Sequence, residues 1–414
     1  MPDPFLKPVD LSRYAEISSL SQEFPITNET LHRLGAIPLV TANWGNYQNA
    51  QSFKTERAGN GTLTDEMAER IDQSGFTGGW RYPATIDVRT DSYQKKNAEV
   101  GAHLAKRVFE ARDWDQADIL VFASASSRIE TPEDIASQLH QAGMRVDNTL
   151  FYGMACAGAT AAMSDLNRMT DLRGKRVVLV ALESLSGSTI DPDDIQTAWT
   201  FGNGGAALGW VAGEEIIHHG GQTRVIKDPG TIIMPDPYIY QVPQDQLPQS
   251  LWPSWYHFKD EEARNSFGFF HGGAAITMLT EAEKPYAKLN PKRTYAFFAR
   301  NVSQALIDFF STHTFNGLGT GIIHHPSKPV ILGTIERYNE GREKLKDTGS
   351  IILPELDFRW LMPDGVNNVS AATALFHLSQ LMEEKLIKPH VPTPLVGLGI
   401  GSVIHTDVIE FNTD

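Results

Sequence analysis

Cys156 is the residue whose type and position are best suited to covalent chemistry. It is the one cysteine among 414 residues, and it lies in ACAG, between an expected strand, NTLFYGM, and an expected small-residue helix, AGATAAMSDLNRM. A helix that begins at Cys156 would direct its N–H groups and positive dipole end at the sulfur, which lowers a thiol pKa. The same N–H groups can hold an oxyanion, so Cys156 is a candidate nucleophile that takes an acyl group from a thioester. A cysteine that only fills the core would occupy the same kind of position, and this alternative stays open.

Candidate partners for the thiol lie in the second half of the chain. His324 and His325 stand in GTGIIHHPSK, at the carboxyl end of an expected buried strand, where sites gather in sheets of this kind. One of the two can face a site while its neighbour faces away. Asn367 and Asn368 stand in PDGVNNVSAATALF, in a turn before a small-residue helix. For Asn367 we favour a role as turn residue or N-cap.

The elements that must position these residues alternate between strands and helices. ADILVFASAS (117–126) and RVVLVALES are typical of buried strands, whereas EDIASQLHQAG (133–143) and SAATALFHLSQLMEEKLI (370–387) are typical of helices. This alternation predicts an α/β fold with helices covering parallel or mixed sheets. We expect an N-terminal half over residues 1–220, an insertion over 221–290 that forms a lid or a docking surface, and a C-terminal half over 291–414.

Five segments, taken in order, resemble the ketoacyl–carrier-protein synthase III branch of the thiolase-like superfamily. ACAG alone is a weak signal, but all five in order, with matching spacing over about residues 65–220 and 293–414, are specific. The segments are ACAG (155–158), FGNGGAA (201–207), HHPSK (324–328), NVSAA (368–372) and the closing loop GLGIGS (397–402). The resemblance implies a five-layered α-β-α-β-α fold built from two duplicated halves, and a homodimer.

The resemblance also implies a reaction. Cys156 would accept an acyl group, and His324 and Asn368 would hydrogen-bond the thioester carbonyl of a malonyl-type donor. Loss of CO₂ would give an enolate that attacks the acyl-cysteine and releases a β-ketoacyl thioester, in fatty acid or specialised polyketide-like biosynthesis. The backbone N–H groups of Cys156 and Ile400 would form the oxyanion hole. The substrates would be thioesters of phosphopantetheine, on acyl carrier protein or coenzyme A, with no permanently bound cofactor.

Some positions depart from the family pattern. Glu69 and Gln73, in DEMAERIDQSGF, replace a tryptophan and an arginine that grip coenzyme A, so we expect both contacts to be missing and an acyl carrier protein to be the carrier. Thr131 replaces a bulky residue that floors the acyl pocket, which would admit a longer or branched chain. His405 replaces a small residue, and we favour a buried histidine bonded to backbone.

Composition excludes several classes of function. A net charge of −14 disfavours nucleic acid as a partner. The sequence shows no secretory signal and no apolar run near the roughly 20 residues that span a bilayer, so we expect a cytoplasmic protein. Neither GLGTG nor GLGIG has dinucleotide-loop spacing, and the paired histidines lack the spacing of a zinc site, so we expect no metal.

Two alternatives to decarboxylative condensation remain. In the same fold, the acylated Cys156 could transfer its acyl group to an alcohol or amine, or undergo head-to-head condensation with a second acyl chain. The chain could also be a non-catalytic partner subunit of another ketosynthase, although such a subunit has no physical need of the nucleophile.

Overall fold

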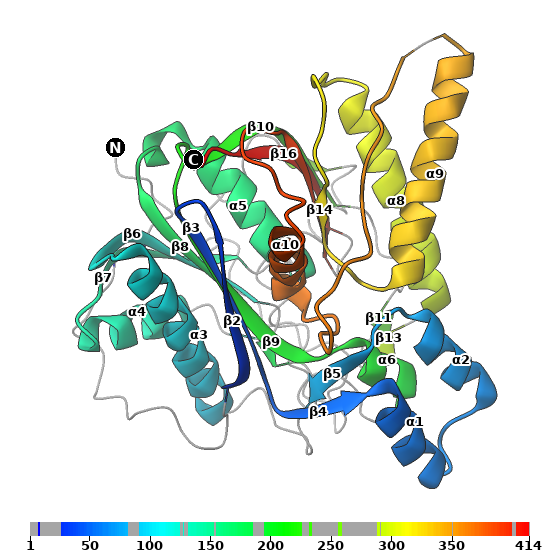
Figure 1. The fold of residues 1–414 in the computed structure, drawn as a ribbon, viewed down its shortest axis with the longest axis horizontal. Helices are drawn as coiled ribbons and strands as arrows, with labels where there is room; N and C mark the ends of the chain where they lie inside the picture. Colours follow the sequence, from blue (N-terminus) through cyan, green and yellow to red (C-terminus); the bar gives the residue numbers. More distant parts are fainter. Residues whose placement is uncertain are drawn as a thin grey trace.

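The structure is a computed structural model. It describes residues 7–8, 26–81, 91–124, 127, 131–152, 155–184, 194–225, 232–233, 256–258, 288–289, 291–349, 351–399 and 403–413. Within these residues the chain forms two large sheets with helices between them and on both outer faces (Figure 1).

The first sheet has seven strands in the order β1-β7-β6-β8-β9-β3-β2. Its centre is parallel, with β6 hydrogen-bonded to both β7 and β8, and the remaining pairs are antiparallel. The strands are β1 (Lys7–Pro8), β2 (Ile26–Leu34), β3 (Ile37–Trp44), β6 (Gln116–Ala123), β7 (Arg145–Tyr152), β8 (Arg176–Ser184) and β9 (Asn203–Val211).

The second sheet has five strands in the order β12-β10-β16-β15-β14. The strands are β10 (Ile216–Val225), β12 (Tyr256–Phe258), β14 (Ile322–Ile323), β15 (Thr393–Gly399) and β16 (Val403–Phe411). β10 crosses the expected boundary at residue 220 and pairs with β16 of the C-terminal half. Most of the expected insertion lies outside the described residues, so its role as a lid or docking surface stays a prediction.

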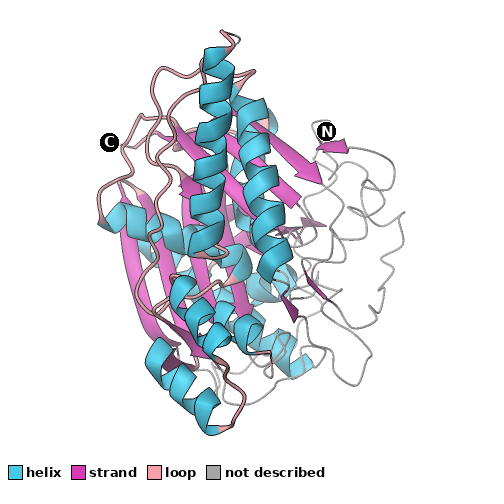
Figure 2. Ribbon diagram, turned by 90° about the vertical axis from the view of Figure 1, so that its right-hand side faces the viewer, coloured by secondary structure: helices cyan, strands magenta, loops and turns pink. Residues whose placement is uncertain are grey.

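The five layers follow from the alternation of side chains along each strand. In β6, Ile119 and Val121 face the central layer, while Leu120 and Phe122 face the outer helices. The central layer holds α5 (Gly158–Arg168) and α10 (Thr373–Glu383), which pack against both sheets. Outside the first sheet lie α3 (Asp91–Arg112) and α4 (Thr131–Gln141). Outside the second sheet lie α8 (Pro291–Phe310) and α9 (Lys328–Asp347), side by side in Figure 2. The predicted five-layered fold is therefore confirmed.

Smaller elements gather beside the edge of these layers (Figure 1). A buried cluster that includes Phe53, Ile71 and Trp199 holds α1, α2 and α6 together. The elements at this edge are β4 (Asn46–Asn49), β5 (Gly78–Arg81), α1 (Ala50–Gly59), α2 (Asp65–Gln73), α6 (Ile195–Thr200), β11 (Ile232–Ile233) and β13 (Lys288–Leu289).

Three 3₁₀ turns complete the described structure: η2 (Ala155–Ala157), η3 (Thr170–Leu172) and η4 (Ser370–Ala372). Within the core, η2 packs against both η4 and β15.

The predicted elements around the site are largely present. The helix expected over 133–143 is α4, and the helix expected over 370–387 is η4 followed by α10. The expectation that a helix begins at Cys156 is wrong: Cys156 lies in the 3₁₀ turn η2, and α5 begins at Gly158. None of the helices in the described part of the chain is long and apolar enough to cross a bilayer.

Candidate active site

Cys156 sits where β7, α5 and β15 converge. Its side chain is buried, with 2% exposed, and its thiol donates a hydrogen bond to Ser370 Oγ at 3.2 Å. Two glycines allow this convergence. A Cβ on Gly158 would lie 3.1 Å from the carbonyl oxygen of Tyr152, and a Cβ on Gly397 would lie 3.2 Å from Cα of Ala157. The small residues around the thiol therefore let β15 approach the nucleophile turn closely.

His324 follows the last residue of β14 and is fixed by its own backbone. Its N–H donates to the carbonyl of Val396 at 2.9 Å, which continues the pairing of β14 with β15. Burial, with a smaller contribution from His325, lowers the pKa of His324 to about 3, so its ring is neutral at physiological pH. The ring nitrogen Nδ1 is buried and has no hydrogen-bond partner among the described residues. A neutral imidazole thus stands at the wall of a cavity with hydrogen-bonding capacity to spare.

His325 faces away from the cavity, as one member of the pair was expected to do. Its Nδ1 lies 2.7 Å from the carbonyl oxygen of Ile323, and its Nε2 lies 3.1 Å from that of Arg359. The ring packs at 4.8 Å from the ring of Trp360. His325 therefore fastens the backbone beside His324 and does not line the cavity.

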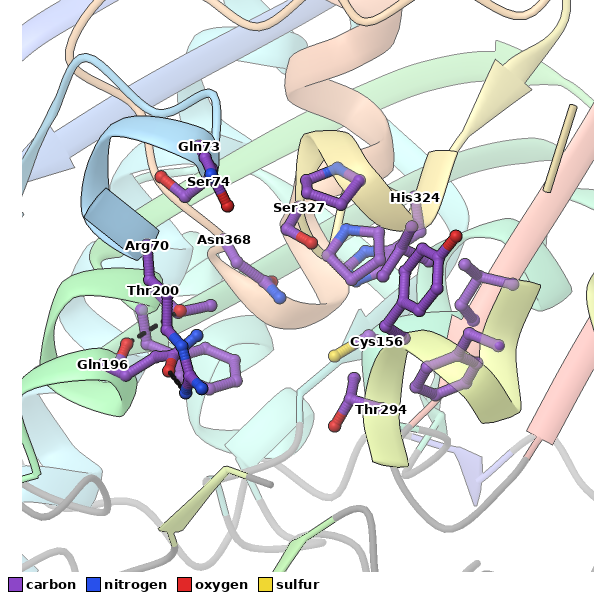
Figure 3. Close-up of a pocket in the computed structure, with 17 residues that line it drawn as sticks. Arg70, Gln73, Ser74, Cys156, Gln196, Thr200, Thr294, His324, Ser327 and Asn368 are labelled. Atoms are coloured by element: carbon purple, nitrogen blue, oxygen red, sulfur yellow. Dashed lines mark hydrogen bonds between the residues drawn. The ribbon is translucent and has the colours of Figure 1, made fainter. Parts of the chain in front are cut away.

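Asn368 is oriented by two donors. Its Oδ1 accepts hydrogen bonds from the Ser370 N–H at 2.9 Å and from the Thr373 hydroxyl at 3.0 Å. Because the oxygen is occupied, the Nδ2 amide group is left to face the cavity, and Figure 3 shows it directed toward Cys156. The neighbouring Asn367 caps no described helix, contrary to the expected N-cap role; its Nδ2 donates to the carbonyl of Trp199.

A cavity of about 260 Å³ brings Cys156, His324 and Asn368 together (Figure 3). Most of its polar side chains lie on or directly after α2 and α6, whereas α8, α9 and β15 contribute most of the apolar ones. Beside Cys156, His324 and Asn368, the polar side chains are those of Arg70, Gln73, Ser74, Gln196, Thr200, Thr294 and Ser327, and the larger apolar ones are those of Phe201, Tyr295, Phe298, Val330 and Leu398.

Arg70 is the functional candidate that the sequence analysis missed. Gln73 lines the cavity as expected, but Arg70 lines it too, so the cavity has a cation despite the substitutions at Glu69 and Gln73. Arg70 Nη1 donates to Gln196 Oε1 at 3.0 Å, and Nη2 donates to the exposed Glu66 at 2.5 Å. Residues three apart share a face of a helix, so the spacing of Arg70 and Gln73 was the available signal.

Three further predicted positions lie away from this cavity or outside the described residues. Thr131 begins α4 and is buried, but it is not among the residues that line the cavity, so its role as a pocket floor stays a prediction. Ile400 lies outside the described residues. His405 is buried as expected, yet its Nδ1 lies 2.8 Å from the hydroxyl of Thr223 and not on a backbone group. Burial lowers the pKa of His405 to about 3.

A metal site does not emerge from the part of the chain that is described. Among those residues, no three histidine, cysteine, aspartate or glutamate side chains gather closely enough to hold an ion.

One protein-family model matches part of this chain. The family model for 3-oxoacyl-[acyl-carrier-protein] synthase III matches residues 152–220, which include Cys156 and the FGNGGAA segment. No curated protein matches the sequence.

Solved structures match almost the whole chain at low identity. The 3-oxoacyl-(acyl carrier protein) synthase III of Pseudomonas aeruginosa PAO1 is 13% identical, with 93% of this chain and 98% of that chain covered and a TM-score of 0.62. The priming β-ketosynthase of the R1128 polyketide pathway is 15% identical, with coverage of 91% and 95% and a TM-score of 0.59. Xanthomonas campestris OleA, solved with bound lauric acid and lauroyl-CoA, is 11% identical, with coverage of 92% and 98% and a TM-score of 0.58. The chain therefore has the thiolase-like fold of these proteins and resembles 3-oxoacyl-[acyl-carrier-protein] synthase III.

Proposed function

We propose that this protein is a ketosynthase that condenses acyl thioesters. Its first step would be acyl transfer to Cys156. The Cys156 sulfur forms a bond to the acyl carbonyl carbon, the carbon–sulfur bond of the donor breaks, and the proton of the thiol ends on the departing thiol. The carbonyl oxygen of the acyl group becomes an oxyanion during this step, and the turn from η2 into α5 would supply backbone N–H groups beside it.

The second step would be a decarboxylative Claisen condensation. A malonyl-type thioester loses CO₂, and the electron pair that remains moves onto the thioester oxygen as an enolate. The enolate carbon then attacks the acyl-cysteine: a carbon–carbon bond forms, the bond between the acyl carbon and the Cys156 sulfur breaks, and the released thiolate takes up a proton from water. His324 and Asn368 would donate hydrogen bonds to the enolate oxygen, because neutral donors stabilise that charge without gripping the carboxylate that must leave.

One observation carries this proposal: the two hydrogen bonds to Asn368 Oδ1, which leave its Nδ2 facing the cavity that also holds Cys156 and His324. A structural asparagine would have its amide N–H groups bonded to the protein, as Asn367 has. Here the donor is held ready for a group that enters the cavity.

The substrates would be phosphopantetheine thioesters carried by an acyl carrier protein. Arg70, at the polar side of the cavity beside Gln196, offers a cation for the phosphate of the pantetheine arm. The protein would act as a cytoplasmic homodimer in fatty acid or polyketide-like biosynthesis. Replacing Arg70 with glutamine should raise KM for the carrier-bound thioester and leave KM for a phosphate-free pantetheine thioester unchanged.

The test is a condensation assay with an acyl thioester and carboxyl-labelled malonyl thioester. We expect the wild type to give labelled CO₂ and a β-ketoacyl product in equal amounts. In an assay whose turnover requires the acyl donor, Cys156→Ala should give neither. Formation of product without CO₂ would refute decarboxylative condensation.

Head-to-head acyl condensation is the second candidate. Tyr295, Phe298 and Val330 on one wall of the cavity would accommodate a second acyl chain, and OleA, which has a similar fold, was solved with bound lauric acid and lauroyl-CoA. In that case two acyl thioesters would give product with no malonyl donor. A chain that neither acylates nor condenses, and that copurifies with another synthase, would instead be a partner subunit.

A further inference from the structure

Ser370 has an uncommon backbone conformation directly beside the thiol. Its φ is +48°, in the left-handed region that few residues other than glycine adopt. A serine held there is strained, and such residues persist only where their surroundings fix them. Ser370 is also fully buried, with 0% exposed.

The turn that holds Ser370 also holds Asn368. The Ser370 N–H donates to Asn368 Oδ1 at 2.9 Å, and the Thr373 hydroxyl donates to the same oxygen and accepts from the Val369 N–H. These bonds fix the position of the Ser370 side chain, whose Oγ lies 3.2 Å from Cys156 Sγ. A single turn of chain thus presents the Asn368 amide to the cavity and the Ser370 hydroxyl to the sulfur.

Ser370 contacts the sulfur but, unlike Cys156, is not among the residues that line the cavity. We therefore expect an entering substrate to leave the contact between Ser370 and Cys156 in place. A hydroxyl can accept a hydrogen bond from S–H, and after the thiol loses its proton it can rotate and donate to the thiolate. The donated bond is charge-assisted and is roughly twice as strong as one between neutral groups.

The ionisable side chains around Cys156 come from several elements and include two cations, Arg70 and Arg168. His324 is neutral, and Arg70 lines the cavity from α2. Neither β15 nor η4, which pack against η2, contains an ionisable side chain. The remaining packed elements, α5 and β16, carry Asp165, Arg168, His405, Asp407 and Glu410.

We propose that the Ser370 hydroxyl stabilises the thiolate of Cys156 and is a catalytic residue of this site. The assignment rests on the proposed function only in taking Cys156 as the nucleophile. As the thiol dissociates, its proton passes to water or to the departing thiol, and the hydroxyl hydrogen of Ser370 turns onto the sulfur.

The test is the pH dependence of Cys156 alkylation by iodoacetamide, which reports on one sulfur because the chain has one cysteine. We expect Ser370→Ala to move the midpoint of the profile up by about one pH unit, from the loss of one hydrogen bond to a charged group. Alkylation at pH 7 would then be about tenfold slower, with an unchanged plateau at high pH. Ser370→Gly, which adopts the positive φ without strain, should give the same shift if the alanine variant does not fold.

Ser379→Ala is the matched control, because Ser379 is also buried and its hydroxyl donates to the carbonyl of Phe376 within α10. It should leave the midpoint unchanged. A lower plateau at an unchanged midpoint in both Ser370 variants would overturn the proposal, since it would mean that Ser370 affects only access. A shifted midpoint in a protein without condensing activity would keep the assignment and reject the proposed function.

Discussion

Substituting Asn368 with aspartate separates the two chemical steps of the proposed reaction. The carboxylate keeps an oxygen for the Ser370 N–H and the Thr373 hydroxyl, so the turn retains both of the bonds that hold it. The second oxygen replaces the Nδ2 donor that faces the cavity. The substitution thus turns a donor into an acceptor at the place where the enolate oxygen would lie, with little other change in shape.

The expected loss follows from the role of the missing donor. Removing one preorganised donor to a developing oxyanion lowers kcat by about 10² to 10³. Asn368 is 3% exposed, so water can do little to screen the negative oxygen that replaces the amide. We therefore expect decarboxylation to fall by about 10³ or more, while acyl transfer to Cys156 changes by less than about tenfold.

Two assays on the same preparations measure the steps separately. Intact mass after brief exposure to an acyl thioester reports on acylation, and release of labelled CO₂ from a malonyl thioester reports on decarboxylation. Asn60→Asp makes the same change at an exposed residue after α1 and should alter neither step. If Asn368→Asp released CO₂ at the wild-type rate, the assignment of Asn368 as an enolate donor would be refuted.

Further predictions concern packing and pH. In Gly397→Ala the added Cβ would clash with Thr160 and Ala157, which should destabilise the fold by about 1–3 kcal/mol and slow acylation. Gly59→Ala is the control, because a Cβ there has no heavy atom within 4 Å and should change neither quantity. Urea titration measures the stability, and acylation rates are measured on the same preparations. Burial holds the pKa of His324 at about 3, so its ring stays neutral over the physiological range. The decarboxylation rate should therefore not fall as pH drops from about 7.5 to 5.5. A fall in rate centred near the usual histidine pKa, about 6.5, would contradict this. Burial raises the pKa of Asp165 from 3.8 to about 8, so the folded state keeps a proton that the unfolded state loses and stability declines as pH rises through this window. The free energy of unfolding of Asp165→Asn should therefore exceed that of the wild type by an amount that grows by up to about 1.4 kcal/mol for each pH unit between pH 4 and 8. Equal urea midpoints for the wild type at pH 5 and pH 8 would contradict this prediction.

Much of the fold was predictable from local patterns. The alternation in β6 and the amphipathic pattern of α4 are properties of short segments, and the five motifs place those segments in order along the chain. The point at which α5 begins was not predictable. Small residues such as Ala157 and Gly158 are compatible with both a 3₁₀ turn and an α-helix. In the structure, the 3₁₀ turn η2 packs against β15, a strand more than 200 residues later in the chain that no local pattern relates to it.

The finer parts of the site depend on contacts between distant residues. Ser370 is 214 residues from Cys156 in the chain, and no local pattern predicts a hydrogen bond between them. Arg70 was overlooked because matching single positions to a family pattern ignores neighbours on the same helix face. Its partner Gln196 lies 126 residues away, so the cation of the cavity becomes visible only once α2 and α6 are placed together.

Intact mass spectrometry shows directly whether Cys156 carries the acyl group. The protein would be exposed briefly to a panel of acyl thioesters on coenzyme A and on acyl carrier protein. We expect a gain equal to one acyl group in the wild type and no gain in Cys156→Ala. An equal gain in Cys156→Ala, or no gain from any donor, would show that Cys156 is not the acyl carrier.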